Sequence, residues 1–338
     1  MLRSDVELQA FNTLRLPSRA QFFACPDSET EVRAAIADAA TRGLAVTILG
    51  GGSNVVLRAH VPGCVIMPRL RHIRVESDAD AFRVVAGAGI VWHELVRFCL
   101  GQGISGLENL ALIPGCVGAA PIQNIGAYGL ELAERFVSLT AISCRDGSTV
   151  TMDARQCGFG YRDSVFKRLP PGSVLITSVT LRLPLCFQAR TEYPDVRREL
   201  DAMGVRGSGV AVAEAVTRVR RRKLPDVRRT PNAGSFFKNP ILDVDAVDRL
   251  RAQIGDVPTY PDANGIKVAA ARLIDAAGWK GRHIGPAGVW SRQPLVLTNR
   301  GGARAVDVLR LARAIQEDIA GRYGVALEIE PAIIGFDE

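Results

Sequence analysis

The chain has 338 residues, of which 47% are hydrophobic and 23% charged, with a formal net charge of +7. This composition is typical of a folded globular protein, and the length exceeds that of a usual single core, so we expect two or three domains. No apolar run reaches the roughly eighteen residues of a membrane span, so insertion in a membrane is not expected.

The N-terminal sequence and the cysteines indicate the compartment. The stretch MLRSDVELQAFNTL lacks the basic, apolar and small-residue order of a secretory signal, so we expect a cytoplasmic protein. Seven scattered cysteines with no C-x-x-C pair are typical of reduced thiols and predict neither disulfides nor zinc. The four dispersed histidines predict no metal site.

Residues 1–185 mix helix and strand patterns. In residues 28–43, Ser28 and Glu31 form a capping-box pattern, and Val32 and Ile36 share one face of a helix that ends at Gly43. A buried strand that runs into a glycine turn is expected in residues 44–57, and a helix in 92–103. Further strands are expected in residues 63–70, 73–77, 81–89, 138–152 and 173–185.

The remainder of the chain has mostly helical patterns, in residues 195–200, 209–223, 243–255, 267–279 and 305–324. This change of pattern predicts a domain boundary between residues 186 and 225.

Two short glycine motifs need separate interpretations. GQGISG, Gly101 to Gly106, matches G-x-G-x-x-G but ends a helix instead of opening one, so a helix C-cap is the better interpretation. GGGSN comprises Gly50, Gly51, Gly52, Ser53 and Asn54 and follows an expected strand. A phosphate-binding loop and a tight turn between strands both remain open for it.

The segment LIPGCVGAAPIQNIGAYG, Leu112 to Gly129, is rich in glycine, proline and small apolar residues. Few bulky side chains would cover its backbone, as the binding of a flat polar heterocycle requires. A plain surface loop would be more polar. We therefore expect a binding wall here, because long loops in compact domains are usually functional or disordered.

Cations occur in two other notable places. Arg162 lies between Tyr161 and Asp163; a structural ion pair with Asp163 is the leading interpretation, and stabilisation of an oxyanion or carboxylate is the alternative. The run from Arg218 to Arg229 resembles a nucleic-acid patch, but it continues an amphipathic helix, so most of its arginines should be solvated. Lys223, at the end of that helix, is the cation best placed to face an anionic ligand.

These segments, taken in order with NAGSFFKNP (Asn232 to Pro240) and LEIEPAIIG (Leu327 to Gly335), resemble the UDP-N-acetylenolpyruvoylglucosamine reductases of bacterial cell-wall synthesis. The resemblance covers nearly the whole chain. It implies an α+β protein with an FAD-binding region of two α/β subdomains, of the vanillyl-alcohol oxidase (PCMH) type, and a separate α+β substrate-binding domain. The boundaries expected from it are residues 1–70, 71–187 and 188–338, with 326–338 returning to the active site.

The resemblance also implies the site residues. The catalytic set would be Arg162, Ser235 and Glu330, and the substrate contacts would be Tyr193, Lys223, Asn239, Tyr260, Lys280 and Gln293. Non-covalent FAD would lie against Gly50, Gly51, Gly52, Ser53, Asn54, Gly115, Cys116, Val117, Gly118, Ala119, Gln123, Asn124, Gly126, Ala127 and Tyr128. The family usually has an arginine two residues after the catalytic glutamate, where this chain has Ala332, so Glu328 competes with Glu330 for that role.

The implied reaction is the NADPH-dependent reduction, through FAD, of UDP-N-acetylglucosamine enolpyruvate to UDP-N-acetylmuramate, a step that serves cell shape and division. Ser235 would donate the proton, because position matters more than acidity toward a carbanion-like centre. A monomer is expected, with no nucleic-acid partner. The rival interpretations are a flavin oxidase of the same fold and a non-enzymatic nucleic-acid binder.

Overall fold

The computed structural model describes residues 2–337, and it divides into two compact units. Unit 1 comprises Met1–Val6, Arg19–Gly52 and Pro62–Arg221. Unit 2 comprises Glu7–Ser18, Ser53–Val61 and Arg222–Glu338. Each unit therefore consists of three segments, and the segments of the two units alternate along the chain.

One sheet of unit 1 carries helix α1 (Glu29–Thr41). Its strand order is β1 (Arg3–Glu7), β2 (Arg19–Ala24), β5 (His60–Ile66) and β3 (Val46–Ile48). The α1 helix starts where expected, because the Ser28 hydroxyl accepts a hydrogen bond from the Glu31 N–H at 3.2 Å. Val32 and Ile36 lie on the buried face of this helix. The β3 strand is shorter than predicted and half-buried instead of buried.

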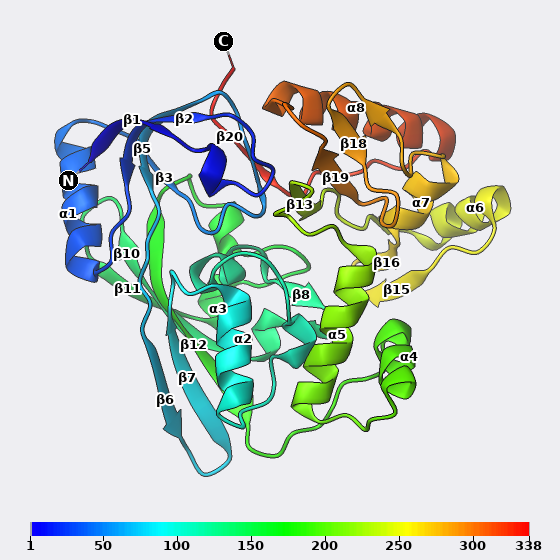
Figure 1. Cartoon of the computed structure of the whole chain (residues 1–338), viewed down its shortest axis with the longest axis horizontal. Helices are drawn as coiled ribbons and strands as arrows, with labels where there is room; N and C mark the ends of the chain where they lie inside the picture. The colour runs from blue at the N-terminus through cyan, green and yellow to red at the C-terminus, as the bar shows by residue number, and fades with distance from the viewer. Residues whose placement is uncertain (1, 338) are drawn as a thin grey trace. The chain divides into compact units, whose positions relative to one another are not determined.

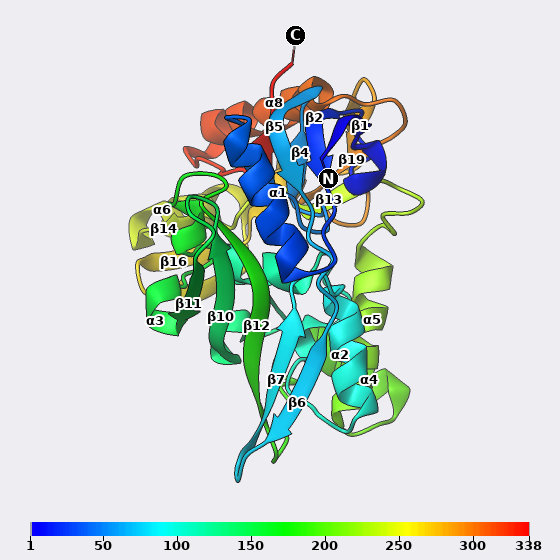
Figure 2. The same cartoon turned by 90° about the vertical axis from the view of Figure 1, so that its left-hand side faces the viewer.

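The second sheet of unit 1 is antiparallel throughout. Its order is β11 (Thr149–Asp153), β10 (Phe136–Ser143), β12 (Val174–Pro184), β7 (Ala81–Gly87) and β6 (Ile73–Ser77). Helices α2 (Trp92–Gly101) and α5 (Gly209–Lys223) lie side by side on one face of it (Figure 1, Figure 2). The largest apolar cluster of unit 1 lies between these helices and the sheet, and Trp92 is its largest fully buried side chain.

Smaller elements complete unit 1. They are α3 (Ala154–Cys157), α4 (Pro194–Met203), the hairpin of β8 (Gly126–Ala127) with β9 (Leu130–Glu131), and the 3-10 helices η2 (Glu108–Leu110), η3 (Val117–Gln123), η4 (Leu132–Glu134) and η5 (Val165–Lys167). The predicted binding wall, residues 112–129, is therefore not a structureless loop. It consists of η3 followed by the β8–β9 hairpin.

Unit 2 is built on a sheet of order β13 (Asn232–Ser235), β19 (Val296–Asn299), β18 (Ala287–Val289) and β17 (His283–Ile284). Helix α8 (Ala305–Tyr323) packs across β18 and β19 (Figure 1). The remaining elements are η1 (Gln9–Phe11), β14 (Ile241–Leu242), β15 (Thr259–Asp262), β16 (Gly265–Val268), α6 (Val244–Ile254), α7 (Ala270–Ala276), and β20 (Ala332–Ile334) paired in parallel with β4 (Val55–Leu57). Buried Phe236, Phe237, Leu311 and Ile315 belong to its core.

The sequence predicted the helices of the second half better than its strands. Helix α5 has the predicted bounds, and α8 ends one residue before the predicted end. The predicted helix over 267–279 is partly wrong, because β16 extends to Val268 and α7 begins only at Ala270. Strands of two to four residues are too short to show an alternating pattern, which is why β13 to β20 were missed. Within residues 2–337, no helix is both long enough and apolar enough to cross a membrane.

Candidate active site

In unit 1, two glycine-rich segments approach each other at backbone distance. A Cβ atom on Gly51 would lie 2.8 Å from the Cα of Gly115, and one on Gly50 would lie 2.9 Å from the Sγ of Cys116 and 3.0 Å from the Cβ of Ala119. Real Cβ atoms do not approach so closely, so only glycine fits here. The residues predicted from Gly50 to Gly52 and from Gly115 to Ala119 therefore form one surface, which we call the glycine cradle.

The donors of the cradle are partly used inside unit 1. The N–H groups of Val117, Gly118 and Ala119 donate to the carbonyls of Ile90, Ala88 and Cys116 at 2.9, 3.0 and 3.1 Å. These three N–H groups are already hydrogen-bonded within the protein, so a cofactor that lies against Val117, Gly118 and Ala119 would be bound by the shape of the surface. Burial raises the pKa of the Cys116 thiol, so this group stays neutral. A smooth, uncharged surface without bulky side chains fits a flat cofactor such as FAD.

Three of the predicted site residues in unit 1 have left-handed backbones although they are not glycine. The φ angles are 45° at Asn124, 48° at Tyr128 and 52° at Arg162. Strain of this kind costs about 1–3 kcal/mol per residue and is concentrated at functional sites. The Arg162 guanidinium donates to the Gly126 carbonyl at 2.6 Å, so the cationic side chain lies against the β8–β9 hairpin.

The predicted partner of Arg162 is wrong. Asp163 pairs with Arg168 instead, and the Arg162 guanidinium lies 5.5 Å from the ring centre of Tyr161. Residues adjacent along an irregular chain point in different directions, so Arg162 and Asp163 have different partners. The Arg162 guanidinium therefore contacts a neutral carbonyl and an aromatic ring.

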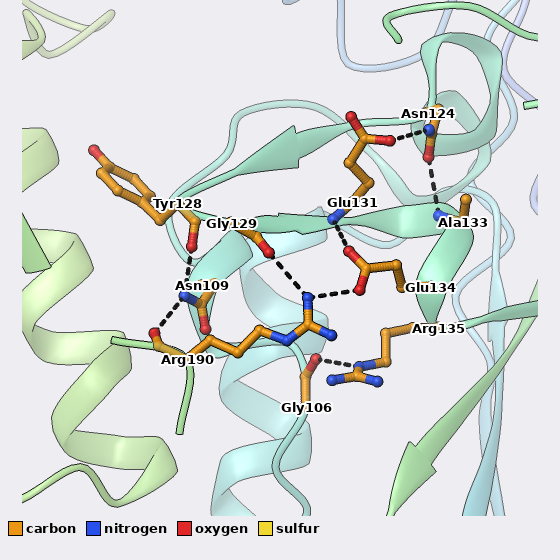
Figure 3. A network of polar contacts seen from close by, with 10 residues as sticks. All are labelled: Gly106, Asn109, Asn124, Tyr128, Gly129, Glu131, Ala133, Glu134, Arg135 and Arg190. Carbon is orange, nitrogen blue, oxygen red and sulfur yellow. Dashed lines mark hydrogen bonds and ion pairs between the residues drawn. The ribbon is translucent and has the colours of Figure 1, made fainter. Parts of the chain in front are cut away.

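A polar network holds the turn that carries Tyr128 (Figure 3). The buried Asn109 amide nitrogen donates to the Tyr128 carbonyl at 2.8 Å and to the Arg190 carbonyl at 3.0 Å. The Arg190 guanidinium in turn donates to the Gly129 carbonyl at 2.9 Å and pairs with Glu134 at 2.6 Å. The network ties this turn to the segment leading to α4.

Two predicted residues meet at the end of that segment. Tyr193 is the residue before α4, and its ring lies edge-on to the Tyr128 ring with 5.1 Å between centroids. Asn124 follows Gln123, the last residue of η3. Its amide nitrogen donates to the Glu131 carboxylate at 2.8 Å, and its amide oxygen accepts from the Ala133 N–H at 2.9 Å. Ala127 lies in β8, between Gly126 and Tyr128.

Sequence reasoning missed two residues of this region, Asn109 and Arg220. Asn109 carries no motif signal, because an asparagine before an apolar run looks like an ordinary loop residue. Arg220 was included in a face expected to be solvated, and Arg218 and Arg221 are indeed exposed. The missed signal was spacing: Arg220 follows buried Val216 by four positions, which places it on the same helix face.

In unit 2, backbone pairing brings Ser235 and Glu330 close together. The Glu330 N–H donates to the Phe236 carbonyl at 2.9 Å, so Glu330 lies opposite the residue that follows Ser235. Both Ser235 and Glu330 are half-buried, while Phe236 and Phe237 are fully buried behind them. Gly234 has φ of 70°, a conformation that lets the strand turn at the serine.

The same pairing separates Glu328 from Glu330. The Lys238 N–H donates to the Glu328 carbonyl at 2.9 Å, and the Lys238 ammonium pairs with the Glu328 carboxylate. The Glu328 side chain is 69% exposed and its charge is compensated. The backbone of Glu330, and not that of Glu328, lies opposite Phe236, the residue that follows Ser235.

Asn54 and Ser53 belong to unit 2, and the unit boundary therefore falls inside GGGSN. The Ala332 N–H donates to the Asn54 carbonyl at 3.0 Å, and the Asn54 amide lies 3.5 Å from the Glu330 carbonyl. This contact, together with the β20–β4 pairing, fixes the C-terminal segment that carries Glu330.

Two predicted substrate residues lie near Ser235 through a shared turn. The Phe236 N–H donates to the Leu295 carbonyl at 2.7 Å, and the Gln293 side chain accepts from the Leu295 N–H at 3.4 Å. The Lys223 carbonyl accepts from the Trp290 indole at 3.2 Å. The turn 290–296 therefore contacts both the end of α5 and the strand that bears Ser235.

The other predicted substrate residues lie on separate elements of unit 2. The Asn239 side chain accepts from the Ala270 N–H at 3.0 Å, at the start of α7. Tyr260 lies in β15 and is 40% exposed, and Lys280 follows α7 and pairs with Asp275 at 3.5 Å. An exposed aromatic ring and an exposed ammonium are suited to a base and a phosphate.

Comparison with known proteins connects these two regions to one family. Residues 20–153 match a model described as FAD binding domain, and residues 226–334 match the UDP-N-acetylenolpyruvoylglucosamine reductase C-terminal domain. A reductase of this name from Azoarcus sp. (strain BH72) is 50% identical over 98% of both chains. The chain belongs to the UDP-N-acetylenolpyruvoylglucosamine reductases.

Further UDP-N-acetylenolpyruvoylglucosamine reductases agree with this assignment. That of Paraburkholderia xenovorans (strain LB400) is 50% identical over 97% of this chain and 96% of its own. The solved structure from Thermus caldophilus is 26% identical, covers 99% of this chain and 100% of its own, and has a TM-score of 0.71. Membership confirms the predicted fold class and makes the protein an FAD-dependent oxidoreductase.

Proposed function

We propose that the protein reduces the enolpyruvyl group of UDP-N-acetylglucosamine enolpyruvate to give UDP-N-acetylmuramate, with NADPH as reductant, in cytoplasmic peptidoglycan precursor synthesis. The observation that carries the chemical part of this proposal is the backbone pairing that places Glu330 beside Ser235. The printed name of the relatives supports the substrate class.

The residues of the glycine cradle would hold FAD, and the bound cofactor would supply hydride transfer from NADPH to the terminal carbon of the substrate double bond. Addition at that carbon leaves negative charge beside the substrate carboxylate. Charge of this kind needs stabilisation and a proton. The residues of the chain supply both.

Ser235 is the proposed proton donor. A hydroxyl is a weak acid in water, but transfer to a carbanion-like centre is downhill, so placement decides its use. The buried rings of Phe236 and Phe237, whose centroids are 5.6 Å apart, fix the strand at the serine and exclude water from its inner side. Glu330 and Arg162 are the proposed groups that stabilise the developing charge.

The remaining assignments extend this proposal to binding. Tyr193, Lys223, Asn239, Tyr260, Lys280 and Gln293 are the proposed substrate contacts, with the two lysines as point charges for the diphosphate. We also propose that the protein is a monomer and has no nucleic-acid partner. Within the FAD-binding region, we propose that one subdomain ends at residue 70 and the next begins at residue 71. A flavin oxidase of the same fold is the second candidate, and rapid reaction of the reduced protein with oxygen would favour it.

Separated half-reactions test the role of Ser235. In Ser235→Ala, we expect oxidation of the reduced flavin by UDP-N-acetylglucosamine enolpyruvate to slow at least about a hundredfold, the lower end of general-acid contributions. Reduction of the flavin by NADPH should be unchanged. Anaerobic stopped-flow absorbance of the flavin measures both steps. Equal slowing of both half-reactions would reject the assignment.

The two glutamates provide a matched control in the same experiment. Glu330→Gln should slow substrate-dependent oxidation of the flavin, whereas Glu328→Gln should leave it near the wild-type rate, because Glu328 is exposed and paired with Lys238. Both changes remove one carboxylate charge. The reverse ranking would assign the role to Glu328.

A further inference from the structure

The start of α2 holds the segment that leads into the glycine cradle. The Trp92 indole donates to the Leu110 carbonyl at 3.0 Å, and the Trp92 N–H donates to the Gly115 carbonyl at 3.0 Å. Val91 and Cys116 form an isolated antiparallel bridge. Trp92 is fully buried, so this end of the helix is fixed in the core of unit 1.

Between these two anchors, a histidine side chain accepts from the backbone. The Leu112 N–H donates to Nδ1 of His93 at 2.9 Å. A ring nitrogen that accepts a hydrogen bond carries no proton, so this imidazole is neutral and its proton is on Nε2. The contact therefore exists only while His93 is uncharged.

Leu112 has a backbone conformation that needs support. Its φ is 59°, in the left-handed region that leucine rarely adopts. Such a conformation persists only where the surrounding structure holds it. Leu112 precedes Gly115 by three residues, so its conformation sets the direction in which the chain enters the cradle. Without the His93 acceptor, a partly buried N–H at this position would lose its partner.

The surroundings of His93 favour the uncharged imidazole. Burial lowers the pKa of His93, and the positive charges of Arg97, Arg221 and Arg220 lower it further. Arg97 is one helical turn after His93 on α2, and the other two arginines belong to α5, which lies beside α2 (Figure 1, Figure 2).

Two carboxylates are also close along the chain or on a neighbouring element. Glu94 follows His93 on α2 and is exposed, and adjacent residues of a helix do not face each other. Glu108, in η2, accepts from the Gly106 N–H at 2.6 Å. Within residues 2–337, neither carboxylate pairs with His93, so neither stabilises its charged form.

We propose that His93 is a positioning residue for the cofactor: its neutral imidazole holds Leu112 in the left-handed conformation and thereby sets the glycine cradle that would hold FAD. Protonation turns the acceptor on Nδ1 into a donor, which cannot bond an N–H. The protein should therefore bind FAD tightly while His93 is neutral and weakly once it is charged. This inference rests on the proposed place of FAD at the cradle.

Release of FAD from the holoenzyme at several pH values tests this role. Diluted holoenzyme is passed through an ultrafiltration membrane, and the fluorescence of the filtrate gives the free flavin. In wild type, the dissociation constant should be level above the pKa of His93 and rise by up to about tenfold for each pH unit below it, the limit for one proton. Because this pKa is lowered, the rise belongs below pH 6.5.

Two substitutions separate the acceptor from the titration. His93→Asn keeps an acceptor in place of Nδ1 but does not titrate, so its affinity for FAD should be near that of wild type and should not change with pH. His93→Leu has no acceptor, so its dissociation constant should be at least about tenfold higher throughout, as expected when a partly buried N–H loses its partner. His72→Asn, at an exposed position of unit 1, is the control and should keep the wild-type pH dependence.

The tautomer of His93 gives a readout that does not depend on activity. In holoenzyme labelled with ¹⁵N at histidine, the imidazole nitrogen shifts show which nitrogen carries the proton, and His93→Asn assigns the signal. At about pH 8, above the usual histidine range, we expect the proton on Nε2. A proton on Nδ1 would overturn the contact with Leu112.

Circular dichroism establishes that each variant is folded; if His93→Leu is not, His93→Asn and the tautomer decide. A folded His93→Leu protein with wild-type affinity for FAD, or a His93→Asn protein with wild-type pH dependence, overturns the positioning role. Gly51→Ala separates this failure from that of the proposed place of FAD. If Gly51→Ala loses FAD while His93→Leu retains it, only the role of His93 is wrong. If both retain FAD, its place at the cradle is wrong as well.

Discussion

Glu108 shows how a single buried side chain can set a pH dependence in unit 1. Its side chain is almost fully buried, and its carboxylate accepts from the Gly106 N–H at 2.6 Å. Burial raises the pKa of this carboxyl, and the backbone N–H groups and Arg135 only partly oppose the shift. The folded protein therefore holds the Glu108 proton more tightly than the unfolded chain does.

The sign of the resulting pH dependence follows from linkage. Stability from this proton is present below the unfolded pKa and is lost as pH rises through the raised folded pKa. We expect Glu108→Gln, which keeps the acceptor without the charge, to melt at a higher temperature than wild type near pH 8. The difference should shrink toward about pH 4, where Glu108 is protonated in both states.

Thermal unfolding followed by circular dichroism at several pH values measures this difference. Glu76→Gln, at an exposed position of β6, should show no comparable dependence. A Glu108→Gln variant that is less stable than wild type at every pH would contradict the assignment of a buried charge penalty.

At the scale of elements, the glycine cradle is defined by contact between two loops. Gly51 and Gly115 meet through their backbones, whereas Gly101 in the last turn of α2 has nothing within 4 Å of its missing Cβ. Gly51 and Gly101 are the same residue type in different surroundings, so the same substitution at Gly101 is a control for the substitution at Gly51.

We expect Gly51→Ala to lose FAD on gel filtration, because the added methyl must push the two loops apart, and overpacking of this kind costs about 1–3 kcal/mol. Gly101→Ala should retain FAD and gain up to about 1 kcal/mol, since alanine favours the helix. The ratio of flavin to protein absorbance after the column measures retention. Equal FAD content in both variants would show that the cradle does not hold the cofactor.

The whole molecule consists of two units, each with its own apolar core. A cofactor that binds the folded state stabilises it by mass action. We therefore expect removal of FAD to lower the melting temperature by several degrees, because ligand at a hundred times Kd contributes about 2.7 kcal/mol, and each kcal/mol is about 2–4 °C for domains of this size.

Melting curves recorded at increasing FAD concentration should show a rising transition temperature in wild type and a weaker rise in Gly51→Ala. A transition temperature independent of FAD in the wild-type protein would contradict binding to the folded state.

Local patterns allowed much of the fold to be predicted. The start of α1 follows from Ser28, and the bounds of α5 follow from its valine spacing, because capping and helical periodicity act within a few residues. The strands of unit 2 were missed, because each is held by partners distant along the chain, as Ser235 is by Val296.

The sequence alone determined the family and the cofactor class, because a long specific motif such as NAGSFFKNP can be recognised without any knowledge of contacts. Only the tertiary structure decided which residues are neighbours: Lys238 with Glu328, Glu330 opposite Phe236, and Arg168 with Asp163. Side-chain partners depend on pairing across long sequence separations and on the direction of each bond, and neither is encoded by spacing along the chain.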